Sequence, residues 1–254
     1  CITESGTGNQ IWVYDLTRST WSRLTSEGEN NLPIWSSDGK RVIFASVRPG
    51  ARPLLWMPAD GSGPAEELAR EKEWTYPSSS SPDGKVIAVT LAVPSGPEIW
   101  MLPLEGDRKL RPFLVPPFHG EVAQFSPDGR WVAYTSNESG RFEVCVRPYP
   151  GPGGKWLIST DGGAAPVWAR SGREIFYRSG DKMMAVPVQT GSAFSAGTPQ
   201  VLFEGHGLHS FDVLPDGQRF VMVQAPDKAA APLQLVFVPD WSDELKFRLR
   251  GALK

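Results

Sequence analysis

A short turn element recurs through most of the chain at a nearly constant distance. Its clearest copy is Phe125-Ser126-Pro127-Asp128-Gly129, which is followed by the β-rich run Arg130 to Tyr134. The glycines of successive copies are residues 39, 84, 129, 172 and 217, so the copies lie 45, 45, 43 and 45 residues apart. A repeat of this length indicates one structural unit built several times, in which neighbouring units bury each other's apolar faces.

The residues of the element are those of a tight hairpin turn. Proline fixes φ at the second turn position, aspartate accepts hydrogen bonds from the nearby backbone, and glycine adopts the left-handed conformation. The recurring aspartates could instead form a repeated metal or acid site. Because proline and glycine flank the aspartate at turn positions, the hairpin turn is the favoured interpretation.

Two further strands are expected after each hairpin, because aromatic and β-branched residues dominate the segments that follow it. The expected third strands are Gln10 to Leu16, Leu54 to Met57, Glu98 to Leu102, Arg141 to Arg147, Lys182 to Val188 and Gln234 to Val238. The expected fourth strands are Thr20 to Leu24, Ala65 to Leu68, Arg111 to Val115, Lys155 to Ser159 and Gln200 to Phe203. Four strands in about 45 residues predict the blade of a β-propeller, and therefore an all-β chain.

The strand count also predicts how many blades the chain contributes. The chain opens with a third and a fourth strand, continues through four complete repeats, and closes with a first, second and third strand. We expect a single propeller domain over residues 1–254, most simply six-bladed, with four complete and two partial blades and an N-terminal truncation of about 30 to 45 residues. Seven or eight blades would need one or two more repeats upstream. Cys1 could alternatively be a lipidated N-terminus left by signal removal.

The last residues of the chain have a different pattern. Trp241, Leu245 and Leu249 are spaced four residues apart, with acidic residues before them and basic residues towards the end. This pattern predicts a short amphipathic helix over residues 240–250 whose charges match the helix dipole. The helix would pack against the last blade or, alternatively, dock a partner.

Composition excludes several classes of partner. The chain has 26 Lys and Arg against 28 Asp and Glu, so its net charge of −2 argues against nucleic-acid binding. Its longest apolar run, Val86 to Val93, is far shorter than the ~20 residues of a spanning helix, so no direct membrane insertion of this chain is expected. Its two cysteines are too few for a disulfide framework.

The sequence offers little that resembles catalytic machinery, and we expect no catalytic residue, no bound metal and no cofactor. The chain contains no Gly-x-Ser-x-Gly nucleophile elbow. His206, His209 and Asp212 could ligate a metal, but a polar loop before an inner strand is the favoured interpretation. Cys145 lies between two valines on an expected strand, which predicts a buried, unreactive thiol.

The expected binding site is the rim from which the inner strands begin, near the mouth of the central channel. Loops on a rigid scaffold commonly carry function, and a channel with a few polar groups suits a small ligand or a peptide end. The candidate ligand-binding residues on these loops are Glu29, Asn31, Glu73, Trp74, His119, Glu121, Asp161, His206 and His209. A solvated rim without a ligand is the alternative.

The repeated turn and several later segments of the chain resemble a known family. The Phe125 to Gly129 turn and its period resemble the repeat of TolB-type, WD-repeat-like propellers. Several segments between residues 160 and 250 resemble the C-terminal sensor propeller of bacterial eukaryotic-like serine/threonine protein kinases. These segments are Pro166 to Trp168, Arg173 to Tyr177, Met184 to Val188, Phe194 to Pro199, Phe211 to Val213, Asp216 to Phe220 and Trp241 to Lys246. Two turns depart from the pattern: Ala169-Arg170-Ser171 replaces Ser-Pro-Asp, and Ser79-Ser80 replaces the aromatic residue.

The resemblance implies a non-catalytic propeller for ligand sensing or protein–protein interaction. In such kinases it would lie outside the cytoplasmic membrane, on the periplasmic side, tethered by an upstream membrane helix that this chain lacks. Its partner would be an unknown protein, peptide or small molecule. The alternatives are a periplasmic TolB-like scaffold protein, a metal-dependent propeller hydrolase, or the propeller of a peptidase whose catalytic domain is not in this chain.

Overall fold

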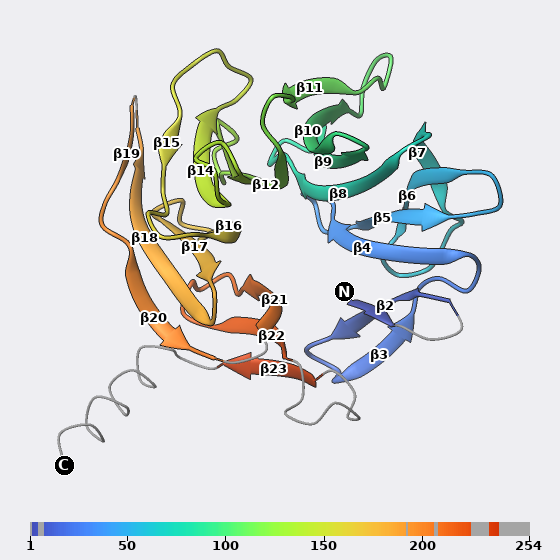
Figure 1. Ribbon diagram of the computed structural model, residues 1–254. Helices are drawn as coiled ribbons and strands as arrows, with labels where there is room; N and C mark the ends of the chain where they lie inside the picture. Colours follow the sequence, from blue (N-terminus) through green and yellow to red (C-terminus); the bar gives the residue numbers. More distant parts are fainter. Residues whose placement is uncertain (1, 5–7, 192, 206–207, 225–233, 239–254) are drawn as a thin grey trace. The chain divides into compact units, whose positions relative to one another are not determined.

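The computed structural model describes residues 2–4, 8–191, 193–205, 208–224 and 234–238 (Figure 1). Every regular element in these ranges is a β-strand, and the strands pair antiparallel. The described part of the chain contains no helix that is long and apolar enough to cross a membrane. The predicted helix over 240–250 lies outside the described residues. The chain divides into two compact units, residues 1–125 and 126–254.

Unit 1 holds three sheets and one further strand. A three-stranded sheet is formed by β1 (Ile2–Glu4), β2 (Gln10–Asp15) and β3 (Thr20–Arg23). A four-stranded sheet is formed by β4 (Glu29–Trp35), β5 (Arg41–Val47), β6 (Arg52–Pro58) and β7 (Glu66–Glu71). Another is formed by β8 (Trp74–Ser80), β9 (Val86–Val93), β10 (Gly96–Pro103) and β11 (Arg111–Leu114). The last strand of this unit, β12 (Gly120–Phe125), lies beside β8.

Unit 2 repeats this meander with one addition. Its first sheet pairs β13 (Trp131–Ser136), β14 (Glu143–Pro148) and β15 (Trp156–Leu157). The second pairs β16 (Ala164–Trp168), β17 (Glu174–Ser179) and β18 (Lys182–Thr190), and β18 also pairs with both β19 (Phe194–Ala196) and β20 (Gln200–Glu204). The third pairs β21 (Leu208–Val213), β22 (Phe220–Gln224) and β23 (Gln234–Val238). The predicted third and fourth strands are confirmed, while β19 was not predicted.

The recurring element forms the turn that its residues predict. Gly129 has a φ of 71°, the left-handed conformation that glycine adopts without strain. The Ser126 hydroxyl donates to Asp128 Oδ1 over 2.6 Å and accepts the backbone N–H of Trp131 over 3.0 Å. Asp128 Oδ1 also accepts the backbone N–H of Arg130. Serine and aspartate together therefore satisfy the backbone donors of the turn.

The same contacts recur in two turns of unit 1. Ser36 donates to Asp38 and Ser81 donates to Asp83, each over 2.6 Å. The pKa of Asp83 lies below its ordinary value. The main cause is the hydrogen bond from Ser81, and the second is the hydrogen bond from the backbone N–H of Lys85. The turn interpretation of these aspartates is thus confirmed by the structure.

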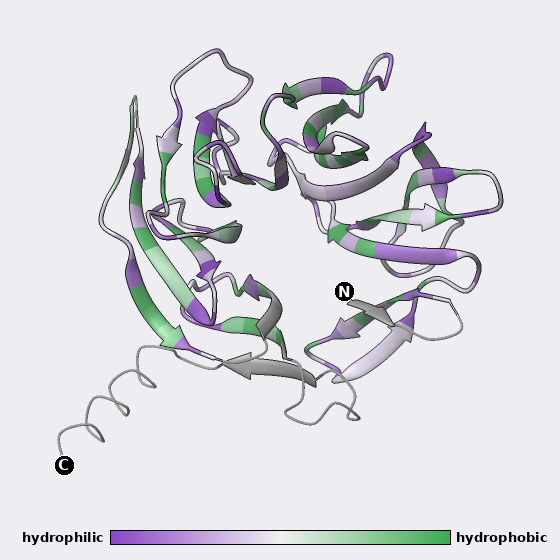
Figure 2. Cartoon of the chain, viewed as in Figure 1, coloured by the Kyte–Doolittle hydropathy of each residue, from purple (hydrophilic) through white to green (hydrophobic). Residues whose placement is uncertain are grey.

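Apolar residues run along the central strands of several sheets in each unit (Figure 2). Along β9 the five residues from Ile87 to Leu91 are all buried, and along β5 the five residues from Val42 to Ser46 are buried as well. Strands covered on both faces do not need to alternate apolar and polar residues. This is why sheets with these sequences stack face to face.

The unpredicted strand β19 is held by aromatic packing within unit 2. The Phe194 ring lies 5.2 Å from the ring of Trp131, 5.4 Å from that of Trp156 and 6.4 Å from that of Trp168, measured between centroids. Phe194 is 4% exposed. Aromatic side chains of this size contribute strongly to burial, and tilted or edge-on pairs add to it. Phe194 therefore anchors a short strand whose neighbours, serine and alanine, have little strand preference of their own.

Replacing the turn hydroxyl should destabilise the fold. In Ser126→Ala the buried N–H of Trp131 loses its acceptor, so we expect the free energy of unfolding to fall by about 1–3 kcal/mol. Urea denaturation measures this as a lower midpoint with an unchanged slope. The matched control is Ser36→Ala, which removes the same contacts from a solvent-exposed turn and should cost less than half as much. Equal costs in the two variants would contradict this account.

Candidate functional site

The predicted rim residues lie where the inner strands begin. In unit 1 these positions are Glu29 and Asn31 on β4, Glu73 and Trp74 at the start of β8, and His119 and Glu121 at the start of β12. In unit 2, Asp161 precedes β16 and His209 lies within β21, whereas His206 lies outside the described residues. The proposal that all nine residues serve one ligand site stays a prediction.

The inner strands share a backbone irregularity. The pairing register shifts between Asn31 and Ile34 on β4, and between Ala164 and Val167 on β16. Three residues with side chains have positive φ there: Leu32 at 52°, Val122 at 52° and Ala165 at 54°. Such β-bulges bend a strand and re-aim its side chains. The side chain of Leu32 is accordingly 52% exposed although it is apolar.

A threonine hydroxyl accepts a hydrogen bond from the backbone at two of these positive-φ residues. The backbone N–H of Val122 donates to Thr90 Oγ1 over 3.3 Å, and that of Ala165 donates to Thr135 Oγ1 over 3.1 Å. Both threonines occupy the same position of a second strand, four residues after the first residue of that strand, Val86 in β9 or Trp131 in β13. In each unit, a threonine of one sheet thus helps to fix the backbone of the inner strand in the sequence after that sheet.

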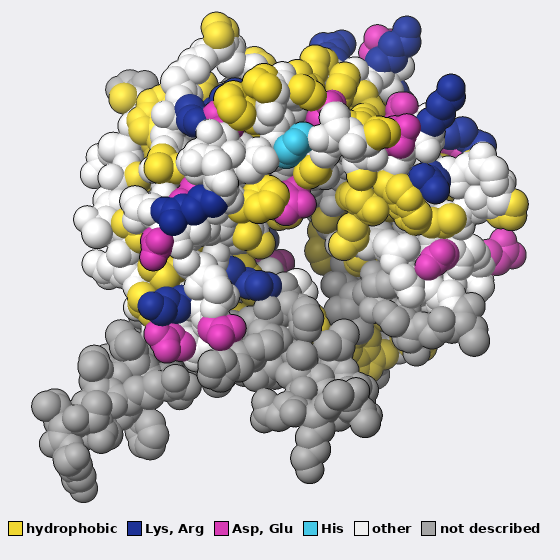
Figure 3. Space-filling model, viewed as in Figure 1, with side chains coloured by type: hydrophobic (Ala, Val, Ile, Leu, Met, Phe, Trp, Pro, Cys, Tyr) yellow, Lys and Arg dark blue, Asp and Glu magenta, His cyan; other side chains and the backbone are white. Residues whose placement is uncertain are grey.

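Two aromatic residues, Trp74 and Tyr76, lie at the start of β8. Together with Arg52 and Leu32 they form what we call the aromatic–arginine patch. The Trp74 and Tyr76 rings stack with centroids 5.9 Å apart and an interplanar angle of 20°. The Arg52 guanidinium lies over the Trp74 ring, 4.4 Å from its centroid. Leu32 is on β4, which neighbours β8. Figure 3 shows hydrophobic side chains gathered over β4 and β8 on this face of unit 1.

The two sides of β8 differ in their surroundings. Thr75, between the two aromatic residues, is 4% exposed, whereas Trp74 and Tyr76 are half-buried on the opposite side of the strand. Partial burial raises the pKa of the Tyr76 phenol, an effect that the positive charge of Arg52 opposes. The patch therefore combines apolar area, a hydroxyl and a positive charge at one strand end.

Two other predicted rim residues, Asn31 and His119, contact neighbouring segments of unit 1. Asn31 Oδ1 accepts a hydrogen bond from Asn9 Nδ2 over 2.5 Å, which links β4 to the segment before β2. The His119 ring packs against the backbone of Gly96, where an added Cβ would lie 2.2 Å from His119 Nδ1. Gly96 also has a φ of 126°, so this position requires glycine.

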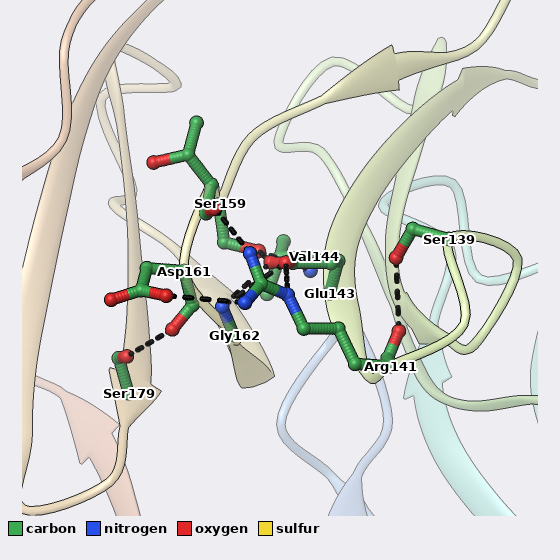
Figure 4. Close-up of polar contacts among 9 residues, drawn as sticks. Ser139, Arg141, Glu143, Val144, Ser159, Asp161, Gly162 and Ser179 are labelled. Carbon is green, nitrogen blue, oxygen red and sulfur yellow. Dashed lines mark hydrogen bonds and ion pairs between the residues drawn. The ribbon is translucent and has the colours of Figure 1, made fainter.

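In unit 2, the predicted residue Asp161 belongs to a polar cluster with Arg141 and Glu143 (Figure 4). Arg141 Nε donates to Glu143 Oε1 over 2.6 Å, and Arg141 Nη1 donates to Asp161 Oδ1 over 3.1 Å. Arg141 Nη2 also donates to the carbonyl oxygen of Thr160. The Glu143 side chain is 2% exposed and that of Asp161 is 96% exposed. One arginine thus joins a buried carboxylate to an exposed one.

The Glu143 carboxylate is fully occupied as an acceptor. It receives the hydroxyl of Ser159 and the backbone N–H of Gly162 in addition to Arg141. Ser159 Oγ in turn accepts the backbone N–H of Val144 over 2.7 Å. A carboxylate that accepts from Ser159 and Gly162 in this way fixes the loop before β16, because both donors belong to that loop.

Unit 1 contains a neutral version of this arrangement. Thr25 Oγ1 accepts the backbone N–H of Ile11 over 2.9 Å and donates to Gln10 Oε1 over 2.7 Å. Gln10 Nε2 donates to the carbonyl oxygen of Gly28, in the loop before β4. The positions match those of Ser159, Val144 and Glu143. Sequence analysis did not identify Arg141 or Glu143, although the recurring pair of Gln or Glu followed by Ile or Val at the third strand would have indicated them.

The described residues contain no group of three or more His, Cys, Asp or Glu side chains placed to hold a metal ion. Cys145 is 2% exposed, and burial raises the pKa of its thiol to about 11. A thiol with this pKa stays protonated near neutral pH and is a poor nucleophile. The prediction of a buried Cys145 is confirmed.

The comparisons with known proteins identify the architecture. The crystal structure of TolB from Acinetobacter baumannii matches 91% of this chain with a TM-score of 0.73 and 18% sequence identity. The fold is a TolB-like β-propeller. The periplasmic gluconolactonase PpgL of Pseudomonas aeruginosa also matches, over 93% of this chain and 82% of its own, with a TM-score of 0.58 and 18% identity. No protein-family model matches the sequence.

A curated relative is the uncharacterized peptidase YuxL of Bacillus subtilis, 27% identical over 171 residues. The match covers 53% of this chain and 26% of YuxL. The chain likewise spans 57% of the Acinetobacter TolB chain. The chain therefore spans only part of the length of YuxL and of the Acinetobacter TolB.

Removing the negative charge of Glu143 should loosen the loop before β16. In Glu143→Gln one oxygen becomes an amide that can no longer accept from these donors, so we expect a loss of about 2 kcal/mol in the free energy of unfolding. Chemical denaturation measures the change. Asp161→Asn is the matched control, because it removes the exposed carboxylate bound to the same arginine and should leave the midpoint unchanged. A large effect of Asp161→Asn would contradict the assignment of Glu143 as the anchoring carboxylate.

Proposed function

We propose that this chain is a non-catalytic interaction domain that binds a protein or peptide through the aromatic–arginine patch. The observation that supports the proposal is the stack of Arg52, Trp74 and Tyr76 at the start of an inner strand, with the exposed Leu32 on the neighbouring strand β4. Tryptophan, tyrosine and arginine are the residues most enriched among those that dominate binding energy. The ring stacking holds the side chains in place before a partner arrives, which lowers the entropy cost of binding.

The carboxylates of unit 2 favour binding over acid–base catalysis. Glu143 accepts three kinds of donor, and Glu138, whose side chain is 6% exposed, pairs with Arg147 over 3.2 Å and with Lys155. A general acid or base needs a carboxyl that can exchange a proton with a substrate at low cost. Carboxylates held by two or more donors inside the protein instead stabilise the scaffold.

The proposed parent protein is a membrane-bound bacterial serine/threonine kinase with this propeller as its extracytoplasmic C-terminal domain. The segments between residues 160 and 250 that resemble the sensor propellers of such kinases support this proposal, and so does the similarity to a gluconolactonase named as periplasmic. Binding at the patch would change the contacts or the oligomeric state of the propeller, and the kinase would respond across the membrane.

The gene on both sides of this segment tests the proposed parent. We expect a kinase domain and one membrane helix to be encoded upstream of the Cys1 codon. A signal peptide directly upstream, with no kinase, would overturn the kinase proposal and favour a periplasmic scaffold protein. Sequencing the flanking DNA gives the result.

The peptidase alternative has its own support, because the relative YuxL is named as a peptidase. In this alternative the propeller would serve a hydrolase domain encoded elsewhere in the same gene. A downstream domain with a Gly-x-Ser-x-Gly elbow would favour it and would contradict the kinase proposal.

The aromatic–arginine patch can be tested with a random peptide library displayed on phage. We expect selected peptides to bind the wild-type chain and to lose at least about tenfold in affinity for Trp74→Ala, as expected for truncation of a central aromatic residue. The control is Trp21→Ala, which removes another exposed tryptophan, one that contacts Tyr14 on the β2–β3 hairpin, and should leave binding unchanged. Peptides that bind both variants as well as wild type would overturn the assignment of the patch.

A further inference from the structure

Unit 2 contains a cavity away from the starts of its inner strands. The cavity has a volume of about 730 Å³ and lies between the β16–β17 turn and the β18–β19 hairpin. It is lined from the turn by Ser171, Gly172 and Arg173, and from the hairpin by Pro187 to Gly191 and Ser195 to Gly197. Its volume is in the range of sites that hold small molecules.

The lining has the chemistry of a carbohydrate site with one positive charge. Three hydroxyl side chains (Ser171, Thr190 and Ser195) and one amide (Gln189) are distributed around the cavity. Arg173 is exposed, and none of the described residues forms an ion pair with its guanidinium. Since arginine binds carboxylates through two parallel hydrogen bonds, this group is available for a ligand anion.

The walls of the cavity are fixed by hydrogen bonds. Arg130 Nη2 donates to the carbonyl oxygen of Thr190 over 2.6 Å, and Asp128 holds the Arg130 side chain in turn. The backbone N–H of Val188 donates to the carbonyl oxygen of Arg173 over 2.7 Å, which joins the two walls. A site whose walls are already ordered loses little entropy when a ligand binds.

The buried side of the hairpin reinforces this order. Gln189 pairs with Ser195 in the β18–β19 ladder, and their neighbours Val188 and Phe194 are buried in the tryptophan-rich core. Alternate residues of a strand point to opposite faces. The core therefore holds the hairpin from one face, while Gln189 and Ser195 occupy the opposite, exposed face.

We propose that this cavity binds a short carbohydrate that carries a carboxylate, with the carboxylate on Arg173 and the sugar hydroxyls on Ser171, Gln189 and Ser195. A single guanidinium among neutral hydrogen-bonding groups matches a sugar acid, which carries one negative charge among several hydroxyls. A doubly charged phosphate would favour a site with more positive charge or several convergent backbone N–H groups. The site is independent of the aromatic–arginine patch, which lies in unit 1.

Two disaccharides that differ only in the carboxylate test the proposal. Cellobiouronic acid carries one carboxylate, and cellobiose carries none. We expect the acid to shift the amide NMR signals of residues 171–173, 188–191 and 195–197 in the complete chain, and to bind at least about tenfold more tightly than cellobiose, the difference that about 1.4 kcal/mol provides. Arg173→Gln should reduce the affinity for the acid to that for cellobiose.

Arg170→Gln is the matched control, because Arg170 is an exposed arginine of the same turn that does not line the cavity. We expect this variant to bind the acid within about twofold of wild type, since one exposed charge outside the site is largely screened by salt. Trp74→Ala should also bind the acid normally, which separates this site from the proposed function. Equal binding of the two disaccharides, equal losses in the two arginine variants, or tighter binding of glucose 6-phosphate than of the acid would each overturn the proposal.

Discussion

The structure depends on sheets that are apolar on both faces. Strands such as β5 and β9 bury five successive residues, so neither face of their sheets can be left to solvent. Each sheet must therefore be covered by a neighbour on either side, and a chain that repeats the same sheet meets this requirement by stacking its own copies. The hydrophobic effect favours this stacking, but it does not by itself fix the register of one sheet against the next.

Hydroxyl side chains order the turns and loops that connect these sheets. Ser126 orders the turn that opens a repeat, Thr135 supports the bulge of β16, and Ser159 joins the third strand to the loop that leads onward. Each of these hydroxyls satisfies a backbone N–H that would otherwise be buried without an acceptor, which is costly. The polar groups are thus concentrated at strand ends, where they orient the loops, and the apolar groups are concentrated between sheets.

Much of this fold could be predicted from the sequence because its signals are local. The turn residues and the aromatic third strands repeat at a fixed distance, and they gave the strand order and the buried sheets. The strand β19 escaped prediction because Phe194-Ser195-Ala196 has weak strand preference, and its place is decided by contacts of Phe194 with tryptophans 26 to 63 residues earlier in the sequence. The Arg141–Glu143–Asp161 cluster escaped for a similar reason, because its hydrogen bonds cross between segments that the sequence separates. Trp74 was predicted at the rim, whereas its stacking partners Arg52 and Tyr76 were not, since only the folded sheets bring β6 beside β8.

The contrast between Gln10 and Glu143 shows how one scaffold can hold loops by different means. At Gln10 a neutral amide donates to one carbonyl oxygen and accepts one hydroxyl, and the surroundings are neutral as well. At Glu143 a charged carboxylate accepts from a serine, a glycine N–H and an arginine, and the arginine extends the contact to the exposed Asp161. A buried carboxylate is tolerated here because Arg141 and the convergent donors offset its desolvation. In these two repeats a hydroxyl residue, Thr25 or Ser159, is kept after the fourth strand, while its acceptor changes from a neutral amide to a carboxylate.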